Sequence, residues 1–172
     1  EISTSNFATP DTRTTIGGKE ALSKLYIPQY TSVDNSAFGY RALHNNYIGG
    51  ENTAIGSYSL SAATTADKNV AVGPGAGQSI TTGAENVAVG ADALDANTTG
   101  GNNTAIGRHA LGSNTTGEIN TAVGSFSMYT NTTGYGNTAV GRNSLYTNNG
   151  NNNTAVGHQS LEANTTGGDS VA

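Results

Sequence analysis

The sequence predicts an all-β fold in which the chain winds into a parallel β-solenoid with coils of about 17 residues. The first observation is a repeat, because "NTAVG" and its variants return every 17 residues, with one spacing of 16. The second is that "TAVG" and "VAVG" are short β-branched runs closed by a turn residue, which is typical of strands. The third is the abundance of Gly, Asn and Thr, which disfavours helix interiors. A short fixed period of this kind indicates stacked coils.

Composition excludes several classes of protein. Only 11% of the 172 residues are charged and 6% are aromatic, a composition that without the repeat would indicate disorder. The formal net charge is −5 and the seven Lys and Arg residues are scattered, so we expect no nucleic-acid partner. No apolar run is long enough to span a bilayer, and we expect no membrane contact in this segment. The absence of Cys excludes disulfides and thiolate metal sites.

The chain divides into two unequal parts. Residues 1–34 predict an N-terminal cap or a junction, which contains one degenerate copy of the repeat, "TTIGGKEAL" at 14–22. Residues 35–172 predict a β-roll of about eight coils that continues or is truncated at the C-terminus.

Each copy of the repeat opens with Asn. In a solenoid these residues stack in a column, and their side-chain amides are expected to hydrogen-bond from coil to coil while Asn also tolerates left-handed backbone at a corner. The Asn ladder runs through Asn35, Asn52, Asn69, Asn86, Asn103, Asn120, Asn137 and Asn153.

The strand proper carries two apolar columns. Adjacent strand residues face opposite sides, so Ala and its Val or Ile neighbour predict a strand that is buried on both faces. We expect the Val or Ile column to fill the interior and the small, uniform Ala column to meet another copy of the chain. The alternative is a monomeric solenoid in which Ala only saves space. The Ala column is Ala37, Ala54, Ala71, Ala88, Ala105, Ala122, Ala139 and Ala155; the other is Phe38, Ile55, Val72, Val89, Ile106, Val123, Val140 and Val156.

The remaining elements of the coil are a core position and a loop. Leu or Met stands four residues after each Gly and is expected inside, except in the third copy, where Gly77 holds the Leu place and Ile80 follows; there we expect a rearranged coil. "NTTG", as at 97–100, is interpreted as a polar outer loop. The single deletion falls between Leu145 and Asn153, in that loop, where a change of length costs least.

The motifs "NTAIG", "NVAVG" and "NTAVG", followed by a small residue and Leu, resemble the YadA-like head repeats of trimeric autotransporter adhesins. The "NTAVG" arrays also resemble segments of phage and other viral tail-fibre proteins. The resemblance covers residues 35–172. It implies a left-handed parallel β-roll, a homotrimer, and attachment to a host or surface receptor, outside the cell, on a bacterial surface or in a virion tail fibre.

A candidate ligand-binding surface is aromatic. Tyr129 and Tyr146 share a column one coil apart, Phe126 lies in the same copy as Tyr129, and Tyr58 shares the column of Phe126. Flat rings among Asn and Thr suit a surface glycan, although a protein receptor is equally open. The alternative is that the rings only cover the coil edges and stabilise the stack.

The sequence predicts no catalytic residue, no metal site and no cofactor. His44, His109 and His158 stand in three different columns and form no ladder. The first alternative function is an ice- or crystal-binding solenoid, in which the Thr pairs of "NTTG" form a regular array. The second is a glycan-cleaving enzyme that uses Asp92 or Asp95, which we consider the weaker because no column of carboxylates faces another.

Overall fold

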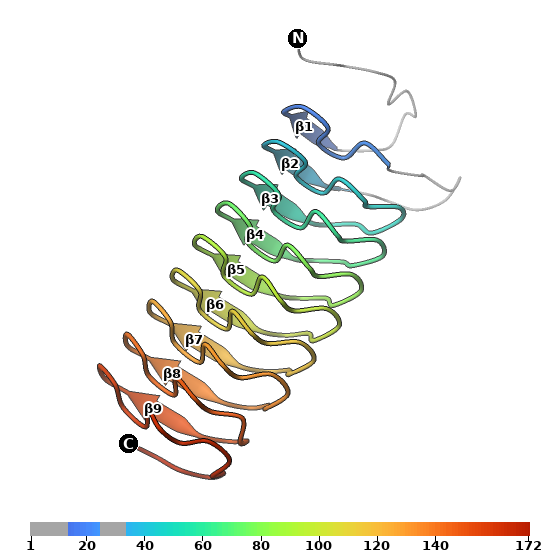
Figure 1. Cartoon of the computed structure of the whole chain (residues 1–172). Helices are drawn as coiled ribbons and strands as arrows, with labels where there is room; N and C mark the ends of the chain where they lie inside the picture. Colours follow the sequence, from blue (N-terminus) through green and yellow to red (C-terminus); the bar gives the residue numbers. More distant parts are fainter. Residues whose placement is uncertain (1–13, 25–33) are drawn as a thin grey trace.

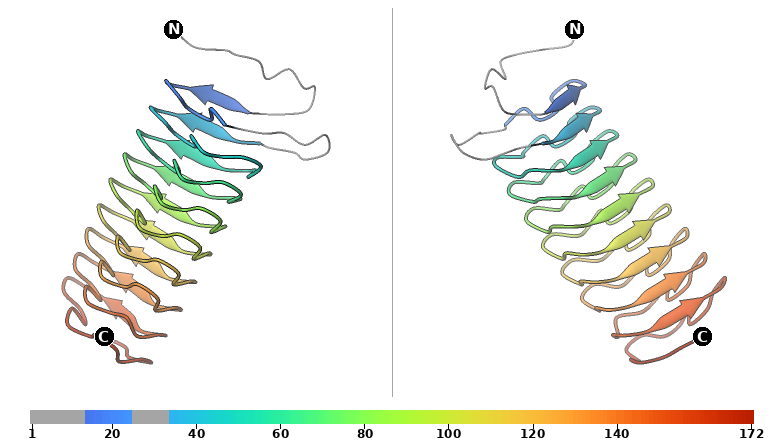
Figure 2. Two further views of the ribbon diagram at one scale, coloured as in Figure 1. Left: turned by 45° about the vertical axis from the view of Figure 1, so that its right-hand side comes forward. Right: turned by 180° about the vertical axis from the view of Figure 1, so that it is seen from behind.

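The computed structural model describes residues 14–24 and 34–172, and these wind into an elongated stack of coils (Figures 1 and 2). Nine strands of three residues form one sheet, in which the order β1 to β9 follows the chain. All neighbouring strands are parallel. The strands are β1 (Thr15–Gly17), β2 (Ser36–Phe38), β3 (Thr53–Ile55), β4 (Val70–Val72), β5 (Val87–Val89), β6 (Thr104–Ile106), β7 (Thr121–Val123), β8 (Thr138–Val140) and β9 (Thr154–Val156).

The predicted β-solenoid of about 17 residues per coil is confirmed. From β2 onward, each strand pairs with the next so that Ala lies beside Ala and the Val or Ile column lies beside itself, as in Ala105 with Ala122 and Ile106 with Val123. The described residues include no helix, and therefore none that could cross a membrane. The repeat thus fixes the register directly, because any slip would break every column at once.

The chain buries the ladder Asn and the central Ala of each strand and leaves the first and third strand residues half-buried or exposed, which corrects the predicted faces of the strand. The Ala column is at most 1% exposed within the single chain, so the expectation that this face meets another copy is wrong. Val and Ile do not fill the interior either: Ile106 is 40% exposed on the outer face. The physical reason is space, since Ala is small enough to face the opposite wall of a narrow coil. The alternative, in which Ala saves space inside one coil, is the one that the burial supports.

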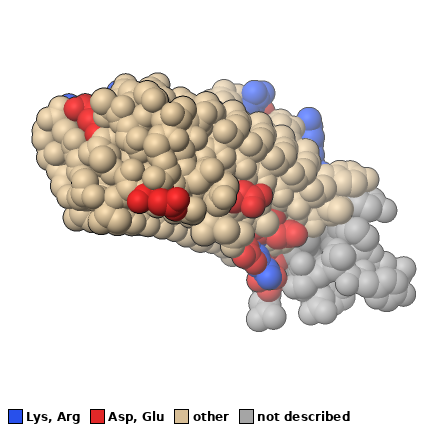
Figure 3. Space-filling view, turned by 90° about the horizontal axis from the view of Figure 1, so that it is seen from below, with Lys and Arg blue, Asp and Glu red and all other residues tan. Residues whose placement is uncertain are grey.

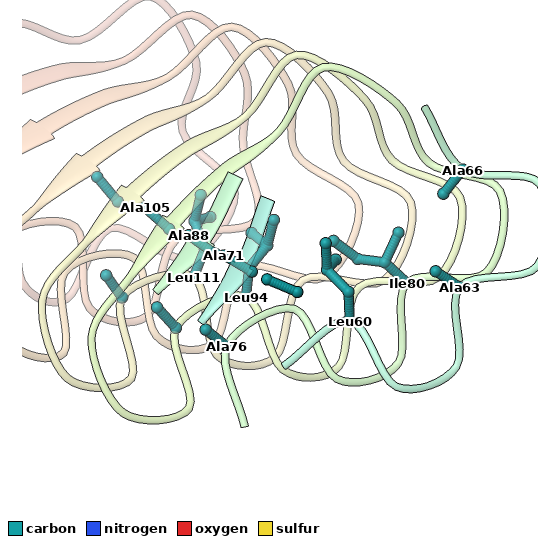
Figure 4. Close-up of a cluster of buried hydrophobic side chains, with 14 of the residues drawn as sticks. Leu60, Ala63, Ala66, Ala71, Ala76, Ile80, Ala88, Leu94, Ala105 and Leu111 are labelled. Carbon is teal, nitrogen blue, oxygen red and sulfur yellow. The ribbon is translucent and has the colours of Figure 1, made fainter. Parts of the chain in front are cut away.

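The opposite wall supplies the large core side chains. The predicted Leu and Met column is buried, as Leu94, Leu111 and Met128 show. Figure 4 shows these leucines pointing toward the strand alanines, for example Leu94 and Leu111 toward Ala88 and Ala105. In the described residues the buried apolar core is therefore mainly Ala packed against Leu, with Met128 and Ile80 among the larger side chains.

The Asn ladder is confirmed in detail. The side-chain oxygen of Asn103 accepts hydrogen bonds from the Asn120 backbone N–H at 3.0 Å and from its Nδ2 at 3.2 Å, while the Nδ2 of Asn103 donates across the coil to the Gly117 carbonyl at 2.8 Å. All ladder residues are buried. Left-handed backbone is found one residue earlier instead, at Asn102 and Ile119, so that part of the prediction is wrong.

A second buried Asn column was not expected. Asn97, Asn114 and Asn131 open the "NTTG" segments, and the Nδ2 of each of the last two donates to the Oδ1 of the Asn before it, at 2.9 and 3.1 Å. The interpretation of "NTTG" as a polar outer loop therefore holds for Thr99 and Thr116, which are exposed, and fails for the Asn, which is inside. The burial of these three Asn residues also leaves no room for a glycan on them.

The short coil keeps the sheet in register. Between β8 and β9 the loop closes through Asn148 Oδ1, which accepts from the Gly150 N–H two residues later at 3.3 Å. Thr138 still pairs with Thr154, which confirms that the deletion lies in the loop. The shorter loop leaves one hydrogen bond unmade in the Asn column of the "NTTG" segments, where the buried Oδ1 of Asn131 has no partner.

The third copy corrects another prediction, because its coil is not rearranged. Gly77 has φ of 58°, close to the 48° of Leu60 in the same column. The side chain of Ile80 replaces the missing Leu: its Cδ1 would lie 3.0 Å from a Cβ at Gly77. Ile80 stands in the column of Asn97. Its side chain therefore fills the space that Gly77 leaves in the Leu column (Figure 4).

The degenerate copy forms the first described coil. Strand β1 pairs with β2, and Ile16 lies beside Ala37. Gly17 replaces the outward apolar residue, and the Phe38 ring covers it, since a Cβ at Gly17 would lie 2.6 Å from Cδ1 of that ring. The rest of the predicted cap, residues 1–13 and 25–33, lies outside the described residues, so the cap stays a prediction.

Candidate functional site

Two surfaces of the described coils are candidates for function. We call the first the strand face: the outward side chains of the sheet, in two columns that run along the solenoid. One column is Ser36, Thr53, Val70, Val87, Thr104, Thr121, Thr138 and Thr154, and the other is Phe38, Ile55, Val72, Val89, Ile106, Val123, Val140 and Val156.

The strand face is uncharged and regular. Every residue in its two columns is neutral, and most of the second column is apolar side chain open to solvent, with Ile55 43% and Val156 61% exposed. Neighbouring strands lie about 4.8 Å apart, so the side chains form a lattice with that repeat along the stack. An apolar strip of this length on the surface marks an interaction site more often than chance.

The second surface is a group of four rings, which we call the ring cluster: His109, Phe126, Tyr129 and Tyr146. The imidazole of His109 stacks on Phe126 with centroids 5.1 Å apart, and Tyr129 meets both rings edge-on, at 5.8 and 5.5 Å. Tyr146 stacks on Tyr129 at 5.5 Å. All four rings are half-buried, so the cluster is held by its own contacts.

Backbone geometry brings these rings together. His109 and Phe126 both have left-handed backbone, at φ of 53° and 59°, two residues after the Gly that ends each strand. Gly107 precedes that position with φ of 132°, where a Cβ would lie 2.6 Å from the Gly124 carbonyl of the next coil. The bend therefore requires Gly, and it sets the side chains that follow in a column.

Polar groups flank the ring cluster at both ends. A carboxylate oxygen of Asp92 lies 4.0 Å from Nε2 of His109. Burial, with the nearby charge of Asp92, raises the pKa of Asp95 above its ordinary value. At the other end the Asn143 side chain donates to Glu162 at 3.2 Å. The guanidinium of Arg108 lies 5.2 Å from the centre of the Phe126 ring, so one face of the cluster carries a cation.

The four aromatic residues predicted from the sequence do not form one site. Phe126, Tyr129 and Tyr146 are brought together, but Tyr58 lies four coils away and packs edge-on against Tyr40 at 5.3 Å. His109, which the sequence analysis considered only as a metal ligand and left out of the aromatic surface, belongs to the cluster. Its position in the column of Phe126, one coil earlier, was a signal that could have placed it there.

Among the described residues, no group of three His, Asp or Glu side chains is placed to hold a metal ion. The comparisons with known proteins add no relative: no family model, no curated protein and no solved structure matches this chain. The resemblance to adhesin head repeats and tail fibres therefore rests on the repeat motif alone.

Proposed function

We propose that this chain is a structural, non-catalytic module of a fibre or adhesin head, which attaches its parent protein to a host or surface receptor. The observation that carries the proposal is the strand face. A rigid stack that leaves an uncharged, β-branched strip open along its whole length gains stability when a second surface covers that strip, because burial of apolar area is favourable.

Self-association is the simplest way to cover the strand face. We place the module outside the cell, on a bacterial surface or in a virion tail fibre, as a left-handed roll in a homotrimer, in line with the repeat motif. In that assembly the strand faces of the copies turn toward one another, and the opposite sides, which carry the ring cluster, stay open to a receptor.

The test of assembly is the mass of the chain in solution by light scattering. The trimer has three times the 17.3 kDa mass of one chain. Replacing two outward residues, Ile106→Glu and Val123→Glu, is expected to give monomers, because a buried, unpaired carboxylate is costly. Thr82→Glu and Thr116→Glu, on the exposed loops, are the matched control and should leave the mass unchanged. A wild-type monomer at high concentration would refute the assembly.

The ring cluster is the proposed receptor contact, and its half-buried rings with flanking carboxylates suit a neutral glycan. An immobilised panel of neutral and sialylated oligosaccharides tests this. We expect wild-type binding to neutral members and at least tenfold weaker binding for Tyr146→Ala, about 1.4 kcal/mol. Tyr58→Ala removes a ring outside the cluster and is the control. If no glycan binds, the glycan contact is refuted.

One observation also supports the alternative of a solenoid that binds ice or another crystal. The regular array needed for that function is present on the strand face, where Thr104, Thr121 and Thr138 stand in line beside Ile and Val. This array differs from the one that the sequence analysis considered, which was formed by the Thr pairs of "NTTG". Thermal hysteresis at micromolar protein, lost in Thr121→Lys, would support this function; none in the wild type would end it.

A further inference from the structure

The short coil between β8 and β9 has a side-chain oxygen where the regular coils have a main-chain carbonyl. In a regular coil the Thr115 carbonyl accepts hydrogen bonds from the backbone N–H groups of Thr98 and Thr99, at 2.9 and 3.4 Å, and from the Thr98 hydroxyl at 3.1 Å. Asn149 stands in the column of Thr115 two coils later, next to the deleted position. There the side-chain Oδ1 of Asn149 takes the place of the carbonyl and accepts from the coil before.

Five donors converge on this oxygen, and we call them the donor set. The backbone N–H groups of Thr132, Thr133 and Gly134 donate to it at 3.0, 3.0 and 3.3 Å. The hydroxyls of Thr132 and Thr133 lie 3.1 and 3.4 Å from it. An amide oxygen has two lone pairs and cannot satisfy five donors, so the donor set suits an oxygen that carries negative charge.

The residue after Asn149 is Gly150, and this is the one Asn–Gly pair in the sequence. The main-chain nitrogen that follows an Asn can attack the amide carbon of its side chain, and Gly hinders the attack least because it has no Cβ. The Gly150 N–H donates to Oδ1 of Asn148 at 3.3 Å, which is longer than an ordinary hydrogen bond and is therefore easily given up. Asn149 itself is exposed, so water reaches its side chain.

We propose that Asn149 is a site of spontaneous deamidation, promoted by the donor set around its side-chain oxygen. The Gly150 nitrogen attacks Cγ of Asn149, and the new C–N bond closes a five-membered succinimide. The side-chain nitrogen of Asn149 leaves as ammonia, with the proton that the Gly150 nitrogen loses. Water then adds to either imide carbonyl, the bond from that carbonyl to nitrogen breaks, and the nitrogen takes up a proton, which leaves aspartate or isoaspartate. This inference does not depend on the proposed function.

The donor set fits the same oxygen at every step. In the tetrahedral intermediate this oxygen carries the negative charge, and donors that are already in place stabilise that charge more than they stabilise the amide. Water that adds at Cγ leaves the oxygen in a carboxylate. Water that adds at the other carbonyl leaves it as a main-chain carbonyl oxygen, as the Thr115 oxygen is in a regular coil. Either product therefore keeps an acceptor for the donor set.

A carboxylate at this position links the two coils more firmly than the amide does, because hydrogen bonds to an ionised group are about twice as strong as neutral ones. The gain falls in the pair of coils where the buried Oδ1 of Asn131 lacks a partner. Deamidation also adds one negative charge to the formal net charge of −5. Charged groups lie in a few small patches on the face shown in Figure 3, and most of that face is uncharged. One added charge is therefore readily separated by ion exchange.

The rate of deamidation tests the proposal on the full chain. Wild-type protein is incubated folded and, at the same pH and temperature, unfolded in urea. Ion-exchange chromatography follows the added charge, and mass spectrometry of peptides locates it. We expect Asn149 to lose its amide faster in the folded chain, because only the folded chain holds the donor set. Slower loss in the folded chain would overturn the proposal, since the hydrogen bonds would then protect the amide.

Thr132→Val isolates the donor set, because it removes one hydroxyl and keeps the backbone N–H groups. We expect the folded variant to deamidate about threefold more slowly than wild type, or more slowly still. The matched control is Thr115→Val, which removes the equivalent hydroxyl one coil earlier, where it donates to the Thr132 carbonyl. Circular dichroism checks that both variants fold. Equal rates in the two variants would overturn the role of the donor set.

Asn149→Asp tests the product directly. At neutral pH this variant is expected to melt at a higher temperature than wild type, because its carboxylate accepts charge-assisted hydrogen bonds from the donor set. Asn149→Ala removes the acceptor and is expected to melt at a lower temperature than wild type. If Asn149→Asp melts no higher than Asn149→Ala, the donor set does not favour a negative charge, and the proposal is overturned.

Discussion

At the residue scale, the fold depends on side-chain amides that act as part of the backbone. Each ladder Asn accepts from the backbone N–H of the equivalent residue in the next coil, which is Asn except for Ser170 after Asn153, and donates to a carbonyl on the far side of its own coil. A buried polar group without a hydrogen-bond partner is costly, so the amides of the narrow interior pair with one another and with backbone carbonyls. The ladder thus links successive coils by hydrogen bonds at the corner, as the backbone hydrogen bonds between paired strands link them in the sheet.

Asn103→Ala is expected to destabilise the chain by about 2–4 kcal/mol. The substitution leaves the buried Asn120 N–H without its acceptor and removes one of the two amide donors to the Gly117 carbonyl, which keeps the hydrogen bond from Asn114 Nδ2. Urea unfolding followed by circular dichroism measures the loss. Thr116→Ala, at an exposed loop position, is the control and should be near neutral. A cost below about 0.5 kcal/mol for Asn103→Ala would show that the ladder contributes little.

Asp95 gives a prediction on pH. Burial and the charge of Asp92 raise its pKa in the folded chain, so the ionised form is less favourable there than in the unfolded chain. The penalty is absent below the unfolded pKa, near 3.9, and complete above the folded pKa. Asp95→Asn is therefore expected to raise the melting temperature at pH 7 and to leave it unchanged near pH 3. An equal effect at both pH values would contradict the assignment.

At the scale of the element, one coil shows how the core tolerates exchange. Gly77 lacks the Leu side chain that its column requires, and Ile80 supplies the missing volume from the neighbouring column. The two positions are coupled, because a Cβ at Gly77 would already lie 3.0 Å from both Ile80 Cδ1 and Leu60 Cδ2. Coupled positions of this kind give effects that do not add.

Gly77→Leu alone is expected to destabilise by about 1–3 kcal/mol through overpacking, and Ile80→Asn alone by at least as much through the cavity and the buried amide. The double variant restores the residues of the other coils and is expected to cost less than either single change. Thermal unfolding of the four chains forms a double-mutant cycle. Additive effects would contradict the exchange of volume between the columns.

The sequence predicted the elements better than it predicted their faces. The period, the parallel register and the Asn ladder follow from the repeat, because identical residues must stack. The inward direction of Ala105 and the outward direction of Ile106 do not follow, since alternation alone leaves the choice between the two faces open. The signal was Asn103, which shares a face with Ala105 and whose ladder is satisfied only inside.

The ring cluster was predicted in part for a similar reason. Columns bring together Tyr129 and Tyr146, which stand one coil apart, and they separate Tyr58 from Phe126 by four coils. Contacts between different columns, such as His109 with Tyr129, depend on how the bend after Gly107 directs each side chain. The repeat spacing does not predict the direction of these side chains.

At the scale of the whole molecule, the stack is a one-dimensional structure in which each coil contacts only its neighbours. Among the described strands, contacts are found only between successive strands. Stability in such a molecule is approximately a sum of the contributions of the coils and of the interfaces between them. The length of the module can therefore vary by whole coils without a change in the fold.

Deletion of residues 103–119, one complete coil, joins Asn102 to Asn120 and restores every column. We expect the shortened chain to fold, to keep its circular dichroism per residue, and to unfold with a smaller free energy because one coil and one interface are lost. The control removes 103–111, about half a coil, which shifts Asn120 out of the ladder and places Ala122 on the wrong face. That chain is expected to lose cooperative unfolding. Equal behaviour of the two deletions would show that register across the coils does not hold the molecule together.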